Sequence, residues 1–97
     1  MAELNAAVAY VIKRLRLEAG LTAEDVYLAT GLSRNAYNRL EWDERTCNIE
    51  QLHAIASIYG LRASDLLHEA EDLVKQGAVP ELPPNITALR KALGLGT

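Results

Sequence analysis

The hydrophobic positions of this chain recur at the spacing of α-helices and do not alternate as they would in β-strands. The first predicted helix spans about residues 4–19 and ends at Gly20, a residue suited to terminate a helix. Its apolar face carries Val8, Val11, Ile12, Leu15 and Ala19. Because the remaining segments show the same periodicity, the pattern predicts an all-α fold.

Polar capping residues predict two short helices after the first. Thr22 is suited to the N-cap of a second helix, and Asp25, three residues later, completes a capping box. Gly31 can adopt the left-handed conformation that ends such a helix. Ser33 then caps a third helix, which we expect to run to about Trp42.

Two amphipathic segments predict a fourth and a fifth helix. Asn48 caps the fourth with support from Gln51, and Gly60 ends it, while the fifth helix ends near Gly77. The predicted apolar face of the fourth helix consists of Ile49, Leu52, Ile55, Ala56 and Tyr59. That of the fifth consists of Leu66, Leu67, Ala70, Leu73 and Val74.

Residues 77–84 read GAVPELPP, and closely spaced prolines favour an extended linker over a helix. Residues 85–97 then form a short amphipathic helical tail, which two turns of helix cannot stabilise alone. The tail must dock on residues 1–76, which we predict to be one folded domain, on a second copy or on another protein, or else fray. Its apolar positions are Ile86, Leu89 and Leu93.

The composition restricts the core and the compartment. The chain has no Phe and one Trp, so its core must be aliphatic. Its one cysteine, Cys47, cannot form a disulfide within the chain and fits a reducing compartment, so we expect a cytoplasmic protein. No apolar run approaches the roughly 20 residues that cross a bilayer. The N-terminus lacks the leading positive charge of a signal peptide, and we expect no membrane partner.

The titratable residues form no recognisable catalytic or metal-binding motif. His53 and His68 fall on different predicted helices without a third ligand candidate, and no nucleophile, base and orienting group can be assembled. The sequence also has no glycine loop of the kind that holds phosphates. We therefore expect neither an enzyme nor a bound cofactor or metal.

The stretch TGLSRNAYNR, residues 30–39, predicts a helix-turn-helix with a basic edge. Gly31 ends one helix, Leu32 fills the turn, and Ser33 starts the next. The net charge of the chain is −3, but residues 1–62 hold seven basic groups against eight acidic ones. The negative balance therefore lies mostly in the C-terminal third, away from this stretch.

The second helix of this motif carries side chains suited to DNA bases. Residues 34, 35, 38 and 39 share the face opposite Tyr37 and Leu40. Arg presents paired donors that match guanine O6 and N7, and Asn matches adenine N6 and N7. Arg and Asn are also common on any solvated helix, so the pattern alone leaves both interpretations open.

Several short motifs at fixed spacing extend the pattern along the chain. They are LR at 15–16, AGLT at 19–22, GLSR at 31–34, LE at 40–41, IEQL at 49–52, IA at 55–56, YGL at 59–61 and DLL at 65–67. On these residues the chain, from Val8 to Leu67, resembles the Cro and phage-repressor (Xre-type) family of helix-turn-helix proteins.

The resemblance implies a five-helix lambda-repressor-like domain that binds double-stranded DNA, usually as a homodimer on a near-palindromic operator. It implies that the helix over residues 33–42 enters the major groove and that an ion pair joins Arg16 to Glu41. The residues it implies for base contacts are Ser33, Arg34, Asn35, Asn38 and Arg39. Those for phosphate contacts are Thr22 at a helix N-terminus, Trp42 with its neighbouring backbone N–H, and Arg45.

The chain departs from the family at two places that bear on DNA. Ala23 replaces a Gln that commonly contacts the backbone, and Trp42-Asp43-Glu44 stands where the family often has basic-Gly-Lys. Two carboxylates near phosphate would weaken non-specific binding. Trp42 also fits a plain surface anchor at a helix end.

Three functions fit this sequence. The first is a sequence-specific transcriptional repressor of phage-immunity or Cro type. The second is an antitoxin with the same DNA-binding fold, whose C-terminal tail binds a toxin. The third is a protein-interaction module that has lost DNA binding. Four residues favour it slightly: Ala23, Trp42, Asp43 and Glu44.

Overall fold

The computed structural model describes residues 2–77, which form five α-helices and no strand. The helices are α1 (Ala2–Glu18), α2 (Ala23–Thr30), α3 (Arg34–Glu41), α4 (Ile49–Ile58) and α5 (Ala63–Lys75). The predicted all-α fold of five helices is confirmed. Beyond Gly77, the predicted linker and tail lie outside the described residues. Within that part of the chain, no helix is both long and apolar enough to traverse a bilayer.

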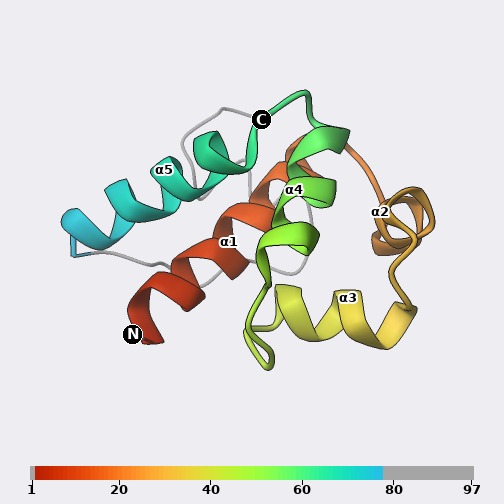
Figure 1. Ribbon diagram of the computed structural model, residues 1–97, viewed down its shortest axis with the longest axis horizontal. Coiled ribbons are helices and arrows are strands. Elements are labelled where there is room, and N and C mark those ends of the chain that lie inside the picture. The colour runs from red at the N-terminus through yellow and green to blue at the C-terminus, as the bar shows by residue number, and fades with distance from the viewer. Residues whose placement is uncertain (1, 78–97) are drawn as a thin grey trace.

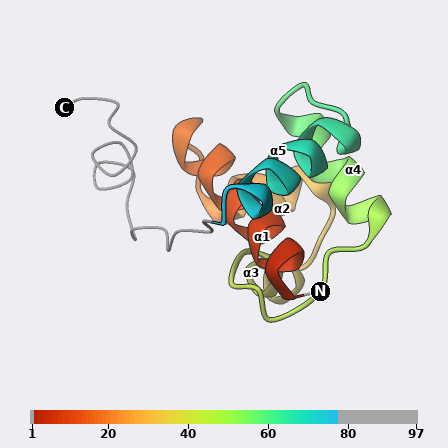
Figure 2. The same cartoon turned by 90° about the vertical axis from the view of Figure 1, so that its left-hand side faces the viewer.

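α1 is the central helix of the domain. α5 lies beside it and runs in the opposite direction, and α3 also packs on α1 (Figure 1). α4 contacts both α5 and α2 and so closes the domain on a further side (Figure 2). α2 and α3 lie together on the side of the domain opposite the C-terminal end of α5 (Figure 1).

The core is built mainly from aliphatic side chains, as the absence of Phe requires. Every helix contributes to it, which ties the whole domain to one apolar cluster. The largest fully buried side chains are Tyr37, Ile12, Leu40, Ile55, Leu66, Val11 and Val26.

Reciprocal capping hydrogen bonds begin α2 and α4 as predicted. Thr22 Oγ1 accepts the Asp25 N–H at 3.1 Å, and Asp25 Oδ2 accepts the Thr22 N–H at 2.8 Å. Asn48 and Gln51 form the same pair of bonds, at 2.8 and 3.0 Å. Because these bonds join residues only three apart, the sequence could locate both helix starts.

Two residues that we predicted on apolar faces are exposed instead. Ala19 lies one residue beyond the end of α1, in the turn that Gly20 completes, so it no longer follows the helix face. Ile49 is the first residue of α4, and its side chain is 80% exposed. Helical periodicity places Ile49 on the inward side of α4, but tertiary packing decides whether a neighbour covers the first turn.

We predict that two isoleucines on α4 differ sharply in their contribution to stability. Ile55→Ala lowers the free energy of unfolding by about 2–5 kcal/mol, because Ile55 is fully buried and its truncation leaves a cavity. Ile49→Ala, the same change at an exposed site, alters it by less than about 0.5 kcal/mol. Urea denaturation of both variants measures the difference, and equal losses would contradict this core.

Candidate nucleic-acid interface

The turn between α2 and α3 has the geometry of a helix-turn-helix. Gly31 ends α2 with a φ of 79°, a left-handed conformation that glycine adopts without a Cβ penalty. Leu32 is half-buried against the core. Ser33 Oγ accepts the Ala36 N–H at 3.1 Å and so starts α3. These three consecutive residues perform the roles that the sequence predicted for them.

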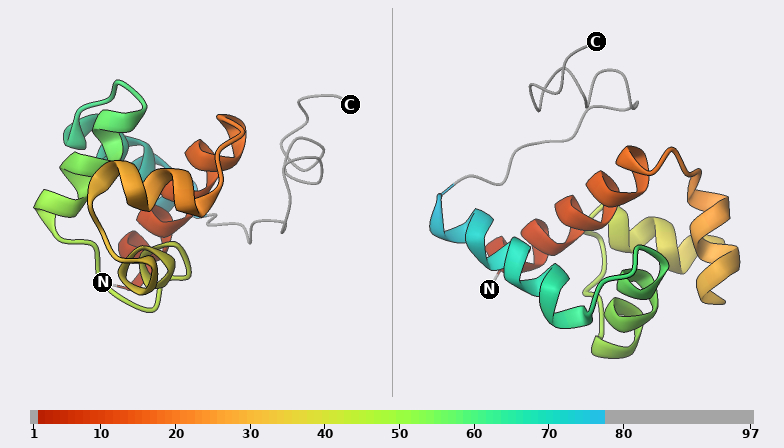
Figure 3. Two further views of the ribbon diagram at one scale, coloured as in Figure 1. Left: turned by 90° about the vertical axis from the view of Figure 1, so that its right-hand side faces the viewer. Right: turned by 90° about the horizontal axis from the view of Figure 1, so that it is seen from above.

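α3 lies at the edge of the domain, and one side of it is open (Figures 1 and 3). On its inward side, Tyr37 and Leu40 are buried in the core. Within residues 2–77, the four outward polar side chains form no ion pair or hydrogen bond with the rest of the chain. All are exposed except the partly exposed Asn38; they are Arg34, Asn35, Asn38 and Arg39. The predicted base-contacting residues therefore share one open polar face, with Ser33 at its start.

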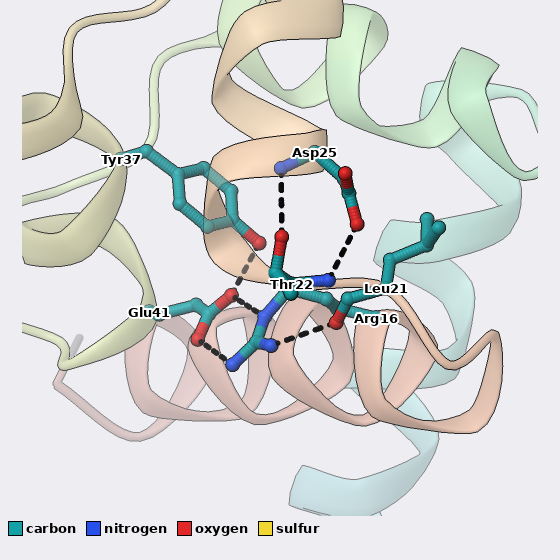
Figure 4. Close-up of polar contacts among 6 residues, drawn as sticks. All are labelled: Arg16, Leu21, Thr22, Asp25, Tyr37 and Glu41. Atoms are coloured by element: carbon teal, nitrogen blue, oxygen red, sulfur yellow. Dashed lines mark hydrogen bonds and ion pairs between the residues drawn. The ribbon is translucent and has the colours of Figure 1, made fainter.

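Thr22, a predicted phosphate contact, is exposed at the N-terminus of α2, where its two hydrogen bonds with Asp25 form the helix cap (Figure 4). The hydrogen bonds from Thr22, first from its backbone N–H, lower the pKa of the Asp25 carboxyl. The N–H groups of Ala23 and Glu24, at the first two helical positions, have no acceptor within the helix. They are the donors that remain for an anion at this end of α2.

Trp42 follows α3, and the residue is 69% exposed. Its backbone N–H is donated to the Asn38 carbonyl oxygen at 3.0 Å, and the Glu44 N–H is donated to the Arg39 carbonyl oxygen at 2.8 Å. The family resemblance implies that a backbone N–H near Trp42 contacts phosphate, but both of these N–H groups already donate to carbonyl oxygens of α3. A phosphate contact at Trp42 would therefore use the indole N–H.

Arg45, the third predicted phosphate contact, is exposed in the segment between α3 and α4. Asp43 and Glu44 precede it and are exposed as well. Asp43 has a φ of 56°, so a non-glycine residue takes the left-handed conformation at the position where the resembling family often has glycine. Asp tolerates this conformation better than most residues, because its short side chain can hydrogen-bond locally.

A buried polar network fixes α3 against α1 (Figure 4). Arg16 Nε donates to Glu41 Oε2 at 2.6 Å, and Arg16 Nη2 donates to Glu41 Oε1 at 3.0 Å. Arg16 Nη1 donates to the Leu21 carbonyl oxygen at 3.0 Å, and the Tyr37 hydroxyl donates to Glu41 Oε2. This confirms the ion pair that the resemblance implied. Its side chains are largely buried, so its role is structural.

The pKa values of two residues of this network and of Tyr59 beside it are raised above their ordinary values. Burial, with the negative charge of Glu41, raises the pKa of Tyr37 far above its ordinary value. Burial also raises the pKa of Tyr59 to about 12, again with a contribution from Glu41. For Arg16, burial opposes the charge, but the hydrogen bond and charge of Glu41 outweigh it and raise the pKa. Both phenols are therefore neutral, and the guanidinium is charged, at physiological pH.

Burial raises the pKa of the Cys47 thiol to about 11, which keeps it protonated at neutral pH. Over residues 2–77, no cluster of His, Cys, Asp and Glu could hold a metal ion.

Sequence reasoning missed two features of this region. The Tyr37 hydroxyl bonds to Glu41 one helical turn away, a spacing that could have suggested the contact. Lys13 lies with its Nζ 5.7 Å from the centre of the Trp42 ring. Lys13 and Arg16 are three residues apart on α1, which places both on the side that faces α3.

A protein-family model described as Helix-turn-helix matches residues 12–66, which is more than half of the chain. The match begins within α1 and ends within α5, so it includes the whole of α2, α3 and α4. Neither the curated proteins nor the solved structures contain a significant match to the chain.

The buried ion pair leads to a matched stability prediction. Glu41→Leu leaves the Arg16 charge buried without a partner and lowers the free energy of unfolding by about 3–5 kcal/mol. Glu69→Leu breaks the pair of Glu69 with Arg14, but Glu69 is 41% exposed, and the loss is at most about 1 kcal/mol. Urea denaturation compares the two, and a similar loss in both would refute the structural role of Glu41.

The raised pKa of Tyr37 predicts a loss of stability at alkaline pH. An unfolded tyrosine ionises near pH 10, whereas the folded Tyr37 keeps its proton. Its contribution is therefore complete below about pH 10 and falls above it by about 1.4 kcal/mol per pH unit. Urea midpoints at pH 8, 10 and 11 should decline less steeply for Tyr37→Phe than for the wild type. Parallel declines would show that Tyr37 titrates normally.

Proposed function

Because the chain belongs to the helix-turn-helix family of Cro and phage-repressor type, a family of DNA-binding regulators, we propose that it is a sequence-specific transcriptional repressor. In this proposal α3 enters the major groove of an operator, as in phage-immunity or Cro-type repressors. The observation that carries it is the open face of α3, whose four polar side chains form no hydrogen bond or ion pair within residues 2–77.

The open face of α3 has the chemistry of direct base readout. Arg34 and Arg39 match the paired acceptors of guanine, and Asn35 and Asn38 match the donor and acceptor of adenine. The Ser33 hydroxyl can contact either kind of base edge. An α-helix with its side chains is about 10–12 Å in diameter, which is close to the width of the major groove, and the eight residues of α3 extend over about 12 Å. The helix can thus lie in the groove and read a few base pairs.

Phosphate contacts would fix the register of α3 on the duplex. The N-terminus of α2 at Thr22 offers N–H donors, and Trp42 and Arg45, which follow α3, offer an indole N–H and a guanidinium. The exposed carboxylates of Asp43 and Glu44 oppose phosphate at this end. We therefore expect weak non-specific binding and a larger share of affinity from the base contacts.

The proposal includes a homodimer, which the single recognition helix within residues 2–77 supports. Residues 2–77 contain one helix-turn-helix, which reads one half-site. Two copies related by a two-fold axis would place their α3 helices about 34 Å apart, one turn of DNA, on a near-palindromic operator.

Two other functions remain as alternatives. An antitoxin would use the same DNA face and bind a toxin through residues 85–97, an arrangement that the proline-containing segment 77–84 and the net charge of −3 favour. A protein-interaction module without DNA binding would be consistent with the acidic pair Asp43 and Glu44. A DNA-binding measurement separates this last function from the first two.

We predict that Arg34→Ala and Arg39→Ala each weaken binding to the correct site by about 1–3 kcal/mol, or roughly 5- to 150-fold. The site is first obtained by selection from random duplex DNA at physiological salt, where an enriched palindrome would also support the dimer. Arg62→Ala is the matched control, because Arg62 is exposed at the start of α5, on the far side of the domain from α3 (Figure 1).

Affinities for the selected duplex and for a random duplex are then compared at one salt concentration. Loss of discrimination in the two α3 variants, with Arg62→Ala unchanged, supports base readout. If the wild type and both α3 variants all bound the selected and the random duplex with the same affinity, base readout by α3 would be contradicted.

A further inference from the structure

A lysine outside the helix-turn-helix lies beside the proposed DNA surface. Lys13 belongs to α1, and its Nζ is 5.7 Å from the centre of the Trp42 ring, within the range of a cation–π interaction. Trp42 as a residue is 69% exposed. The Lys13 ammonium is therefore held by an aromatic side chain at the surface next to the end of α3.

Lys13 and Trp42 line the same open cleft, whose volume is about 560 Å³. Ala23, the first residue of α2, forms another part of its wall, and Asn38 of α3 forms a third. The cleft thus connects the N-terminus of α2, where phosphate binding is proposed, with the exposed face of α3. A DNA backbone that flanks the groove entered by α3 would pass along it.

The charges around the cleft leave Lys13 available to an anion. Arg16 and Glu41 also line it, but their bidentate ion pair neutralises both. Lys13 forms no ion pair with any carboxylate of residues 2–77. Glu44, the remaining charged residue of the lining, is acidic and would repel a phosphate. The four charged side chains of the lining sum to zero, and Lys13 is the cation among them that no carboxylate of residues 2–77 pairs with.

We propose that Lys13 binds a backbone phosphate of the DNA and that Trp42 is the residue that positions its ammonium. This inference rests on the proposed function and extends the DNA contact surface from the helix-turn-helix to α1. The phosphate would accept a charged hydrogen bond from Lys13 Nζ while it faces the N–H groups at the start of α2. Such a contact fixes position on the duplex and carries no base information.

Charge-matched variants test the phosphate contact. Lys13→Gln removes the proposed ligand, Lys13→Arg keeps its charge, and Lys75→Gln removes an exposed lysine from the end of α5. Near 0.15 M salt, Lys13→Gln should bind both the selected and a random duplex about fivefold more weakly. The slope of log affinity against log salt should shrink by about 0.9, the value for one phosphate. Lys13→Arg should restore both quantities, and Lys75→Gln should change neither.

The role of Trp42 is tested by replacing its ring. Trp42→Phe keeps an aromatic face for Lys13 and removes only the indole N–H, so it should lose less affinity than Trp42→Leu, which removes both. Lys13→Gln should weaken binding by Trp42→Leu much less than it weakens binding by the wild type, because the Lys13 contact depends on the ring. Fully additive losses would show that Trp42 acts independently of Lys13.

A duplex with single neutral methylphosphonates locates the phosphate. One substitution should weaken binding by the wild type and Lys13→Arg more than binding by Lys13→Gln, which keeps only the N–H groups of α2 at that phosphate. If the wild type binds the selected duplex and Lys13→Gln binds it with the same affinity as Lys75→Gln, the proposed Lys13 contact is wrong and the proposed function stands. A loss confined to the selected duplex would indicate a base contact and also overturn it. A wild type that binds no duplex would overturn the proposed function and this inference together.

Discussion

Arg16 on α1 and Glu41 at the end of α3 form two hydrogen bonds, and their side chains are largely buried, at 13% and 3% exposed. An unpaired charge there would cost several kcal/mol, so the two side chains must meet. The Tyr37 hydroxyl and the Leu21 carbonyl oxygen occupy further positions around the pair. A displacement of α3 along α1 would break these bonds together. The network therefore holds the outward face of α3 in one orientation.

This arrangement explains how an acidic chain can carry a surface suited to DNA. The one carboxylate within α3, Glu41, is turned inward and neutralised by Arg16. The outward side of α3 is left with guanidinium and amide groups alone. The net charge of the chain therefore says little about this surface, because one buried pair separates the charges of α3 into an inner and an outer set.

The carboxylates around α3 are part of the proposed binding behaviour. Asp25 caps α2 beside the expected phosphate position, and Asp43 and Glu44 follow α3 directly. In the proposed complex they oppose the DNA backbone, so that binding to arbitrary sequences is weakened more than binding to a site with matching bases. Lys13, held against Trp42, would offset part of this repulsion from α1.

The sequence by itself determined the features that depend on neighbours three or four residues apart. The capping pairs that begin at Thr22 and Asn48, the left-handed turn at Gly31 and the polar face of α3 follow from local hydrogen bonding and helix geometry. The Arg16–Glu41 pair lay beyond this reach, and the family resemblance supplied it. Tertiary structure alone decided that Ile49 stays exposed and that Lys13 meets the Trp42 ring. Periodicity assigns a residue to a side of its own helix, whereas the packing of separate helices decides what lies opposite that side.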